Sequence, residues 1–267
     1  MRLKSTLIDA LTEAGKIQKE SFGKSTNISV KESVSSIVTE VDLESEKKIV
    51  DIINKDFPEH NIITEESGFS INNSGYTWVI DPLDGTSNYA SGIPWFGILI
   101  AVFKNQEPVM SGAYLPVEEK LYYAEKGKGA YLNDMLLKIQ DKDLKDVLFA
   151  FSTDYTEDEQ YLNKGMELYK YIVNNSRNVR TTNSLVDLMY VAEGKFGGCI
   201  NLFNMIWDIA APYLIIKEAG GVMKGLDRKE IIFELTDNPV NKDYAIITGA
   251  EPVVKNIEEF LSALQII

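Results

Sequence analysis

The feature that most constrains the fold is a series of four strand-like segments that follow one another between residues 76 and 124. Each is rich in β-branched and aromatic residues, and Gly, Pro or Asn separates it from the next. The segments comprise residues 78–80, 96–103, 109–114 and 121–124. Because no helix is predicted between them, the series indicates an antiparallel or mixed sheet.

Helical patterns precede this series. Apolar residues at three- and four-residue spacing, beginning with Leu3, Leu7 and Leu11, predict an amphipathic helix to about Phe22. A second helix is expected over residues 42–57, because Pro58 blocks its continuation. A short strand at residues 62–63 then leads into two adjacent acids.

Strands and helices alternate after residue 134. The pattern predicts strands at 147–151, 197–200 and 244–248, and helices at 157–173, 184–192, 207–219 and 252–264. No flexible linker is visible. The sequence therefore predicts a two-part α/β chain, with an N-terminal α+β half at residues 1–133 and a C-terminal α/β half at residues 134–267.

Composition excludes several classes of function. The chain has 27 Lys and Arg against 40 Asp and Glu, a formal net charge of −13, so no general attraction to nucleic acid or to an anionic membrane is expected. A phosphate ligand would need bound cations, because an acidic pocket alone repels it. A single histidine, His60, excludes a zinc site built on several His residues and gives little basis for a Ser-His-Asp mechanism.

Cysteine usage and hydropathy bear on location. Cys199 is the only cysteine, which excludes an internal disulfide framework and favours a reduced cytoplasmic setting. The first residues lack the apolar stretch of a signal peptide, and the longest apolar run, residues 97–103, is too short to cross a bilayer. We expect a soluble cytoplasmic protein.

The strongest chemical signal is the segment D-P-L-D-G-T-S-N at residues 81–88. Pro82 biases Asp81 toward an extended backbone, which predicts that the strand ends there and the chain turns. Asp84 can then fold back beside Asp81, and the turn frees the carbonyl of Leu83. These are the oxygen ligands that Mg²⁺ favours.

The rest of that segment suits an anion. Gly85 permits a close backbone approach, and Thr86 with the two residues after it can open a helical turn whose N–H groups face a phosphate. The alternative is an ordinary surface turn, since Asp, Pro, Gly and Asn are standard turn residues.

Further acids stand at the ends of predicted elements. Glu65 and Glu66 follow a strand, and Asp208 stands where a helix should begin, because Pro212 is expected in its first turn. Asp208 could be no more than a helix cap, and the same holds for Asp42.

Four segments in this order resemble the signatures of the inositol monophosphatase family. They are V-T-E-V-D at residues 38–42, E-E-S at 65–67, residues 81–88, and W-D-I-A-A at 207–211 followed by E-A-G-G at 218–221. They span most of the chain. The resemblance implies a layered αβαβα sandwich of the sugar-phosphatase type, and a Mg²⁺-dependent phosphoric monoester hydrolase.

Residue by residue, the resemblance also implies a ligand set. Glu65, Asp81 and the Leu83 carbonyl would hold one Mg²⁺, and Asp81, Asp84 and Asp208 would hold a second. Members of the family can take a third, weaker ion near Glu65. A pair of metal ions explains how a chain with one histidine can manage without an imidazole base.

The catalytic set implied by the resemblance is Asp42, Thr86 and Glu65. Asp42 and Thr86 would share a water and aim it at phosphorus, while the N–H groups of Gly85 and Thr86 cradle the phosphate. Glu66 would support the metal site, and Lys31 stands where the family often has a lysine near the metals. Direct attack by water is expected, with no phosphoenzyme.

Substrate choice is less defined by the sequence. The family includes enzymes that act on inositol monophosphate, fructose bisphosphate, histidinol phosphate, bisphosphonucleotides such as phosphoadenosine phosphate, and other sugar phosphates. Asn201 replaces an acid that contacts ring hydroxyls in inositol-specific members, and Thr182 replaces a common Gly. Around phosphate and substrate the resemblance implies Gly85, Thr86, Asp84, Ser184, Asn201 and Asp208.

Two function classes stay open at this point. The leading one is hydrolysis of a sugar or cyclitol monophosphate, with a 3′(2′),5′-bisphosphonucleotide or histidinol phosphatase as the enzymatic alternative. The other is a non-catalytic protein that binds a metal or ligand on the same fold. Homodimer formation and sensitivity to Li⁺ are expected from the resemblance alone.

Overall fold

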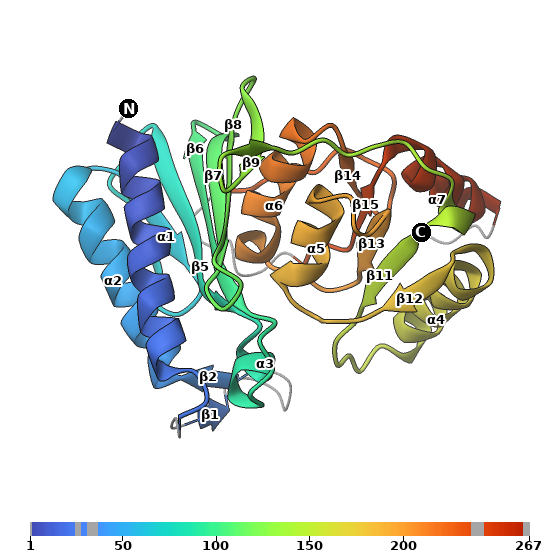
Figure 1. Ribbon diagram of the computed structural model, residues 1–267, viewed down its shortest axis with the longest axis horizontal. Helices are drawn as coiled ribbons and strands as arrows, with labels where there is room; N and C mark the ends of the chain where they lie inside the picture. Colours follow the sequence, from blue (N-terminus) through green and yellow to red (C-terminus); the bar gives the residue numbers. More distant parts are fainter. Residues whose placement is uncertain (1, 25–27, 31–36, 236–242, 264–267) are drawn as a thin grey trace.

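The computed structural model describes residues 2–24, 28–30, 37–235 and 243–263. Its elements form five layers: a helix pair, a sheet, a second helix pair, a second sheet and a third helix pair (Figure 1). The αβαβα sandwich predicted for the chain is therefore confirmed.

The first sheet has eight strands in the order β10-β9-β8-β7-β6-β5-β3-β4. Only β3 and β5 pair in parallel, and all other neighbours are antiparallel, so the predicted antiparallel or mixed sheet is confirmed. The sequence did not predict β4, β9 and β10. The strands are β3 (Asn61–Thr64), β4 (Gly68–Ser70), β5 (Tyr76–Asp84), β6 (Gly97–Lys104), β7 (Glu107–Leu115), β8 (Lys120–Glu125), β9 (Gly129–Leu132) and β10 (Met135–Leu136).

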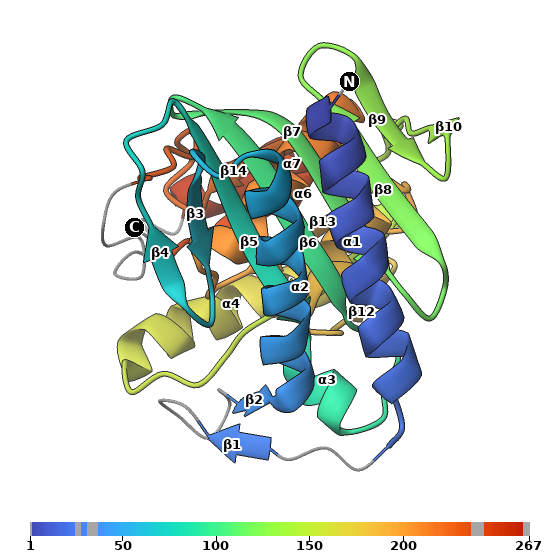
Figure 2. The same cartoon turned by 90° about the vertical axis from the view of Figure 1, so that its left-hand side faces the viewer.

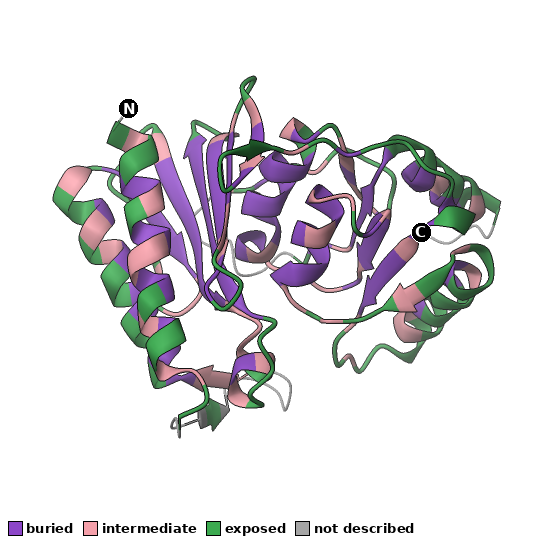
Figure 3. Ribbon diagram, in the orientation of Figure 1, coloured by how far each residue is buried: buried purple, intermediate pink, exposed green. Residues whose placement is uncertain are grey.

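The apolar run at residues 97–103 is explained by a sheet that is covered on both faces. Ile98, Ile100 and Val102 pack in the core beneath the outer helices, whereas the residues between them pack in the core between the two sheets. Because side chains alternate along a strand, a doubly covered strand must be apolar at every position. Figure 3 shows the resulting continuous burial of the central strands.

The helix α1 (Arg2–Ser21) and the helix α2 (Glu40–Asp56) lie side by side across the outer face of this sheet (Figure 2). Apolar residues such as Leu7, Leu11 and Ile49 lie fully buried beneath them. The start of α2 differs from the prediction: Thr39 is the N-cap, and Asp42 lies inside the first turn, where its carboxylate accepts a hydrogen bond from the Thr39 N–H.

Strand β5 also differs from the prediction, because it continues through Asp81 to Asp84. Asp81 pairs with Leu99 and Asp84 pairs with Gly97, so β5 has one more residue than β6 over this stretch. Such a bulge suits Pro82, which has no N–H to donate to the ladder. The extended backbone predicted before Pro82 is present, but the turn comes later, at Gly85, where the helix α3 (Thr86–Ala90) begins.

The middle layer consists of α5 (Leu185–Ala192) and α6 (Ile206–Glu218). Almost all residues of α6 are buried, since it lies between the two sheets. Pro212 is not in the first turn, as the sequence had suggested, because α6 begins two residues before Asp208. Proline removes the N–H that the Asp208 carbonyl would accept in a regular helix, and we attribute the tolerance of that loss to the burial of the helix.

The second sheet has the order β12-β11-β13-β15-β14, and α4 (Glu159–Asn175) and α7 (Glu251–Ala263) cover its outer side (Figure 1). Its strands are β11 (Leu148–Ser152), β12 (Asn178–Arg180), β13 (Gly198–Asn201), β14 (Val222–Gly225) and β15 (Ile246–Gly249). The remaining elements are β1 (Ile28–Val30), β2 (Ile37–Thr39) and the 3-10 helix η1 (Leu144–Asp146).

The core between the sheets contains residues from both sides of position 134, for example Val79 and Phe149. A division of the chain into residues 1–133 and 134–267 stays a prediction. Within the described residues, no helix combines the length and the apolar character needed to cross a membrane.

Candidate active site

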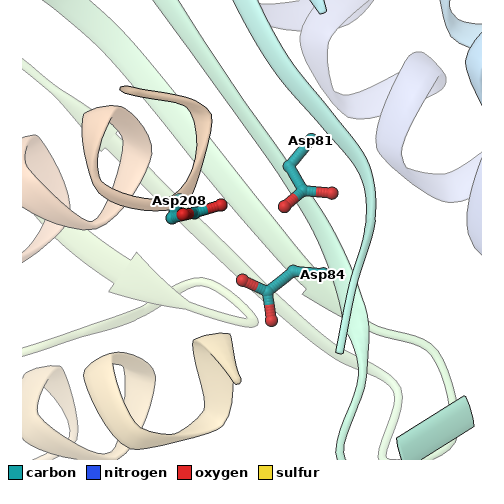
Figure 4. Close-up of side chains that lie close together, drawn as sticks. All are labelled: Asp81, Asp84 and Asp208. Carbon is teal, nitrogen blue, oxygen red and sulfur yellow. The ribbon is translucent and has the colours of Figure 1, made fainter. Parts of the chain in front are cut away.

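Three acids from two layers meet at one point. Asp81 and Asp84 come from the end of β5, and Asp208 comes from the first turn of α6. One carboxylate oxygen of each lies within 4.8 Å of the others, and Figure 4 shows the three carboxyl groups facing a common point. We call these three residues the carboxylate cluster.

Main-chain N–H groups hold each acid of the carboxylate cluster. The N–H of Leu83 donates to Asp81 Oδ1 at 3.0 Å, and that of Leu185 donates to Asp84 Oδ1 at 2.6 Å. The N–H of Met205 donates to Asp208 Oδ2 at 2.6 Å. These bonds fix the orientation of the carboxylates, as a site for a cation requires.

Burial and like charge act together on the cluster. Burial raises the pKa of Asp81 well above its usual range, and the neighbouring carboxylates of Glu65, Asp84 and Asp208 raise it further. Burial likewise raises the pKa of Asp208, with Asp84 and Glu65 adding to it. Burial raises the pKa of Asp84 to about 7, against the opposing hydrogen bond from Leu185. Ionised, these groups repel one another, and a divalent cation with a preference for oxygen would remove that repulsion.

Glu65 and Glu66 occupy the turn that joins β3 to β4. Glu65 lines the same cavity as the carboxylate cluster, and its N–H donates to the Ile80 carbonyl of β5 at 3.3 Å. Its charge also acts on Asp42, Asp81 and Asp208. The N–H of Glu66 donates instead to a buried carboxylate, Glu46, at 3.0 Å.

Asp42 and Thr86 form a second polar group at the edge of the cluster. The Thr86 hydroxyl lies 3.0 Å from Asp42 Oδ1 and 3.0 Å from the Leu83 carbonyl oxygen, so it can donate to either. The other oxygen of Asp42 accepts from the N–H of Thr39 at 2.9 Å and from its hydroxyl at 2.5 Å. Burial raises the pKa of Asp42, against these hydrogen bonds. The pair can therefore hold or release a proton beside the cavity.

The backbone turns into α3 at Gly85, where only glycine fits. Its φ is 86°, and an added Cβ would lie 2.5 Å from the Trp95 carbonyl oxygen and 3.1 Å from Ser184 Cβ. Glycine avoids both the left-handed strain and the clash. Gly85 and Thr86, the residues expected to face a phosphate, both line the cavity.

The cavity has a volume of about 610 Å³. Ser184 and Asn201, which are expected to contact substrate, both line it. Ser184 is the N-cap of α5, and Asn201 Oδ1 accepts from the N–H of Phe203 at 3.2 Å. Thr182 is not among the lining residues; its carbonyl accepts a hydrogen bond from Asn88 at 2.9 Å.

Sequence reasoning missed several polar residues on the side of the cavity away from β5. We call this side the loop wall; it comprises Asp154, Tyr155, Thr156, Asn183, Asn201 and Asp243, of which only Asn201 was predicted. Asp154 stands three residues after a predicted strand, whereas Asp81 follows its strand directly, so the signal at Asp154 was weaker. Asn183 has a φ of 51°, a conformation that Asn tolerates better than most residues.

Lys31 and His60 are two other residues that the sequence singled out. Lys31 lies outside the described residues. His60 is buried away from the cavity, where its ring stacks between Phe57 and Tyr76 and its Nδ1 accepts from the Trp78 indole N–H at 3.0 Å. Burial lowers the pKa of His60, which fits a neutral structural residue.

The family model described as the inositol monophosphatase family matches residues 2–262. This chain belongs to that family. Among its inositol monophosphatase relatives, a protein of Aquifex aeolicus named fructose-1,6-bisphosphatase/inositol-1-monophosphatase is 39% identical over 218 residues, which cover 80% of this chain and 81% of the relative. The four signature segments identified in the sequence therefore carry a true family relationship.

Other members of the family carry a different name. A protein of Pasteurella multocida named Nus factor SuhB is 33% identical over 81% of this chain and 82% of its own length. The crystal structure of the extragenic suppressor protein SuhB of Bartonella henselae superposes with a TM-score of 0.88 at 26% identity, over 98% of both chains. The fold is thus shared by members of the inositol monophosphatase family whose names point to different roles.

Proposed function

We propose that this protein is a Mg²⁺-dependent phosphatase that hydrolyses a small phosphate monoester by direct attack of water. The observation that carries the proposal is the convergence of Asp81, Asp84 and Asp208 beside the Asp42–Thr86 pair, in a cavity large enough for a small ligand. A phosphate monoester carries negative charge that such acids alone would repel, so the cavity suits this substrate only together with cations.

The ligand set proposed for two Mg²⁺ ions comprises Glu65, Asp81, the Leu83 carbonyl, Asp84 and Asp208. Hard oxygen donors of this kind fit Mg²⁺. Burial and neighbouring carboxylates raise the pKa values of Asp81 and Asp208, and a bound cation would offset the repulsion between the ionised groups. When bound, such ions neutralise charge on the phosphate oxygens and lower the pKa of water. A third ion near Glu65 remains part of the proposal.

Side chains and main-chain N–H groups of the protein then orient the attacking water and the substrate. Asp42 and Thr86 orient the attacking water, and Asp42 Oδ1 takes up its proton through the Thr86 hydroxyl, which lies 3.0 Å away. The N–H groups of Gly85 and Thr86 hold the phosphate where α3 begins. Ser184 and Asn201 contact the rest of the substrate, and Glu66 and Lys31 support the metal site.

Inositol monophosphate and fructose 1,6-bisphosphate are the first substrates to test, because the Aquifex aeolicus relative is named for both activities. Phosphate release should be measured on a panel of monoesters with and without Mg²⁺, and the panel should include a bisphosphonucleotide and histidinol phosphate. Turnover that requires Mg²⁺ supports the proposal. A folded protein that releases no phosphate from any member contradicts it.

A second candidate is a non-catalytic binding role, which the name Nus factor of a 33% identical relative favours. Asp81→Asn separates the two candidates. Under the enzymatic proposal the variant loses turnover, and under the binding proposal it keeps its partner. The predicted homodimer is tested by light scattering coupled to gel filtration, and the predicted Li⁺ sensitivity by adding Li⁺ to the phosphatase assay.

A further inference from the structure

A buried carboxylate that the proposed mechanism does not use lies behind the Glu65 turn. Glu46 is only 4% exposed, and it belongs to α2. It follows Asp42 by four residues, so both side chains lie on the same face of the helix. One helix face therefore presents one acid to Thr86 and another to the turn between β3 and β4.

Glu46 accepts hydrogen bonds from both sides of Glu65. Its Oε2 accepts from the Thr64 hydroxyl at 2.6 Å, from the Glu66 N–H at 3.0 Å and from the Ser67 N–H at 3.4 Å. Its Oε1 accepts from the Ser67 hydroxyl. These donors use the acceptor capacity of one carboxylate almost fully.

No Lys, Arg or His of the described part of the chain forms an ion pair with Glu46. A carboxylate removed from water without a countercharge must be stabilised by its hydrogen bonds. The four donors belong to three residues at the end of β3 and in the turn that follows it, so this segment and Glu46 stabilise each other. An ionised acceptor binds such donors more strongly than a neutral one does.

Glu65 lies in the middle of this arrangement. Thr64 before it and Glu66 after it are both held by Glu46, and the N–H of Glu65 itself is held by the Ile80 carbonyl. The backbone on both sides of Glu65 is thus fixed, and Glu65 lines the cavity beside the carboxylate cluster. We propose that Glu46 is a positioning residue that holds Glu65 in place for cation binding, through its hydrogen bonds.

This inference rests on the proposed Mg²⁺-dependent function, but it can be tested apart from turnover. Glu46→Gln keeps an oxygen for Thr64 and Glu66, and its amide can donate to the Ser67 hydroxyl in place of the bond that Glu46 accepts. Glu46→Ala removes all of these bonds. Glu193→Ala is the control, because Glu193 is a half-buried carboxylate that accepts from the Tyr122 hydroxyl at 2.6 Å, pairs with Lys120 and Lys195, and does not line the cavity.

The readouts are the Mg²⁺ concentration that half-saturates phosphate release and the Mg²⁺-induced rise in melting temperature without substrate. Glu46→Ala should raise the half-saturating Mg²⁺ concentration by about tenfold, as is typical when support of a metal ligand is lost. Glu46→Gln should stay within about threefold of the wild type. Glu193→Ala should melt at a lower temperature yet keep the wild-type Mg²⁺ requirement.

Two outcomes overturn the inference: a wild-type Mg²⁺ requirement in Glu46→Ala, or an equal loss in Glu46→Gln and Glu46→Ala, which would assign the effect to charge. If Glu46→Ala does not fold, Thr64→Val removes one donor from the same carboxylate, and an unchanged Mg²⁺ requirement in it overturns the inference. A wild type that is stabilised by Mg²⁺ but releases no phosphate contradicts the proposed function alone. The melting temperatures then still decide the role of Glu46.

Discussion

Acids on opposite sides of the cavity meet different surroundings. In the carboxylate cluster each acid accepts a hydrogen bond from a main-chain N–H group, and burial raises the pKa of all three acids. On the loop wall Asp154, Asp243 and Tyr155 are exposed, although partial burial also raises the pKa of Asp154. Charges that lie close together in a low dielectric, as in the carboxylate cluster, need a fixed geometry. Residues that contact a variable part of a substrate, as proposed for the loop wall, can differ without loss of the chemistry. Under the proposed function, we therefore expect the chemistry on the first side and substrate specificity on the second.

The largest effect should come from the carboxylate cluster. Asp81→Asn removes a proposed ligand of both ions and should lower kcat by roughly 10³-fold on every substrate, because metal ions supply several kcal/mol of transition-state stabilisation. The protein should stay folded, since the change removes like-charge repulsion. The measurement is phosphate release with circular dichroism as the control. Retained turnover would break the assignment of chemistry to this side.

The next effect concerns proton transfer. Thr86→Val is close in shape to the wild type but cannot hydrogen-bond Asp42 Oδ1, and it should lower kcat by about 10²-fold with little change in the Mg²⁺ requirement. Ser184→Ala, on the substrate side, serves as the comparison and should act mainly on KM. A Thr86→Val effect confined to KM would contradict the role given to this hydroxyl.

A smaller effect should appear in the pH dependence of stability. The pKa of Asp84 is raised to about 7, so the folded state binds its proton more tightly than the unfolded state does. The stability linked to that proton is fully present below the unfolded pKa and is lost as pH rises through about 7. In chelator the melting temperature should therefore fall between about pH 4 and about pH 7.

Two comparisons isolate the contribution of Asp84. Asp84→Asn should make the pH dependence in chelator shallower, because the amide does not titrate and only the raised pKa values of Asp81 and Asp208 then remain in the cluster. Mg²⁺ should stabilise the wild type more at high pH than at low pH, since it competes with the proton. Equal Mg²⁺ stabilisation at both pH values would show that Asp84 does not exchange a proton for the ion.

The smallest effect is expected on the loop wall. Asn201→Asp keeps an acceptor for the Phe203 N–H and adds a charged oxygen toward the cavity. It should shift the ratio of kcat/KM between inositol monophosphate and fructose bisphosphate by roughly tenfold, the size of one charged hydrogen bond, with kcat largely unchanged. An effect as large as that of Asp81→Asn would erase the contrast between the two sides.

Local patterns in the sequence predicted most of the strands and helices and placed Asp84 beside Asp81, whereas the order of the layers and the place of Asp208 came from the family resemblance. Apolar runs separated by Gly, Pro and Asn predict the strands, and D-P-L-D-G-T predicts a turn close to the start of α3. The sequence misplaced the end of β5, since nothing local shows that Asp84 still pairs with Gly97 across a bulge. It also placed Pro212 too early in α6, because burial between two sheets outweighs helix propensity.

The missed residues share a physical reason. Glu46 accepts from residues 18 to 21 positions away, and Leu185 donates to Asp84 across 101 positions. Contacts of this kind depend on tertiary packing, so the sequence indicates them only weakly, for example by an acid on the apolar face of a helix. Glu46 is such an acid, four residues after Asp42 and three before the fully buried Ile49. The sequence gives an even weaker signal for the residues of the loop wall, because exposed loop residues follow no periodicity.

The carboxylate cluster joins the eight-stranded sheet to both helices of the middle layer, since Asp84 faces Asp208 of α6 and is tied to the start of α5. A divalent ion seated there would act as a removable cross-link between layers that are otherwise held by apolar packing and by a few hydrogen bonds, such as that from the Tyr122 hydroxyl to Glu193. Removal of the ion by a chelator should therefore increase local unfolding where the eight-stranded sheet meets the middle helices, before the rest of the molecule is affected. Faster amide hydrogen exchange at the starts of α5 and α6, with the outer helices unchanged, would be its signature.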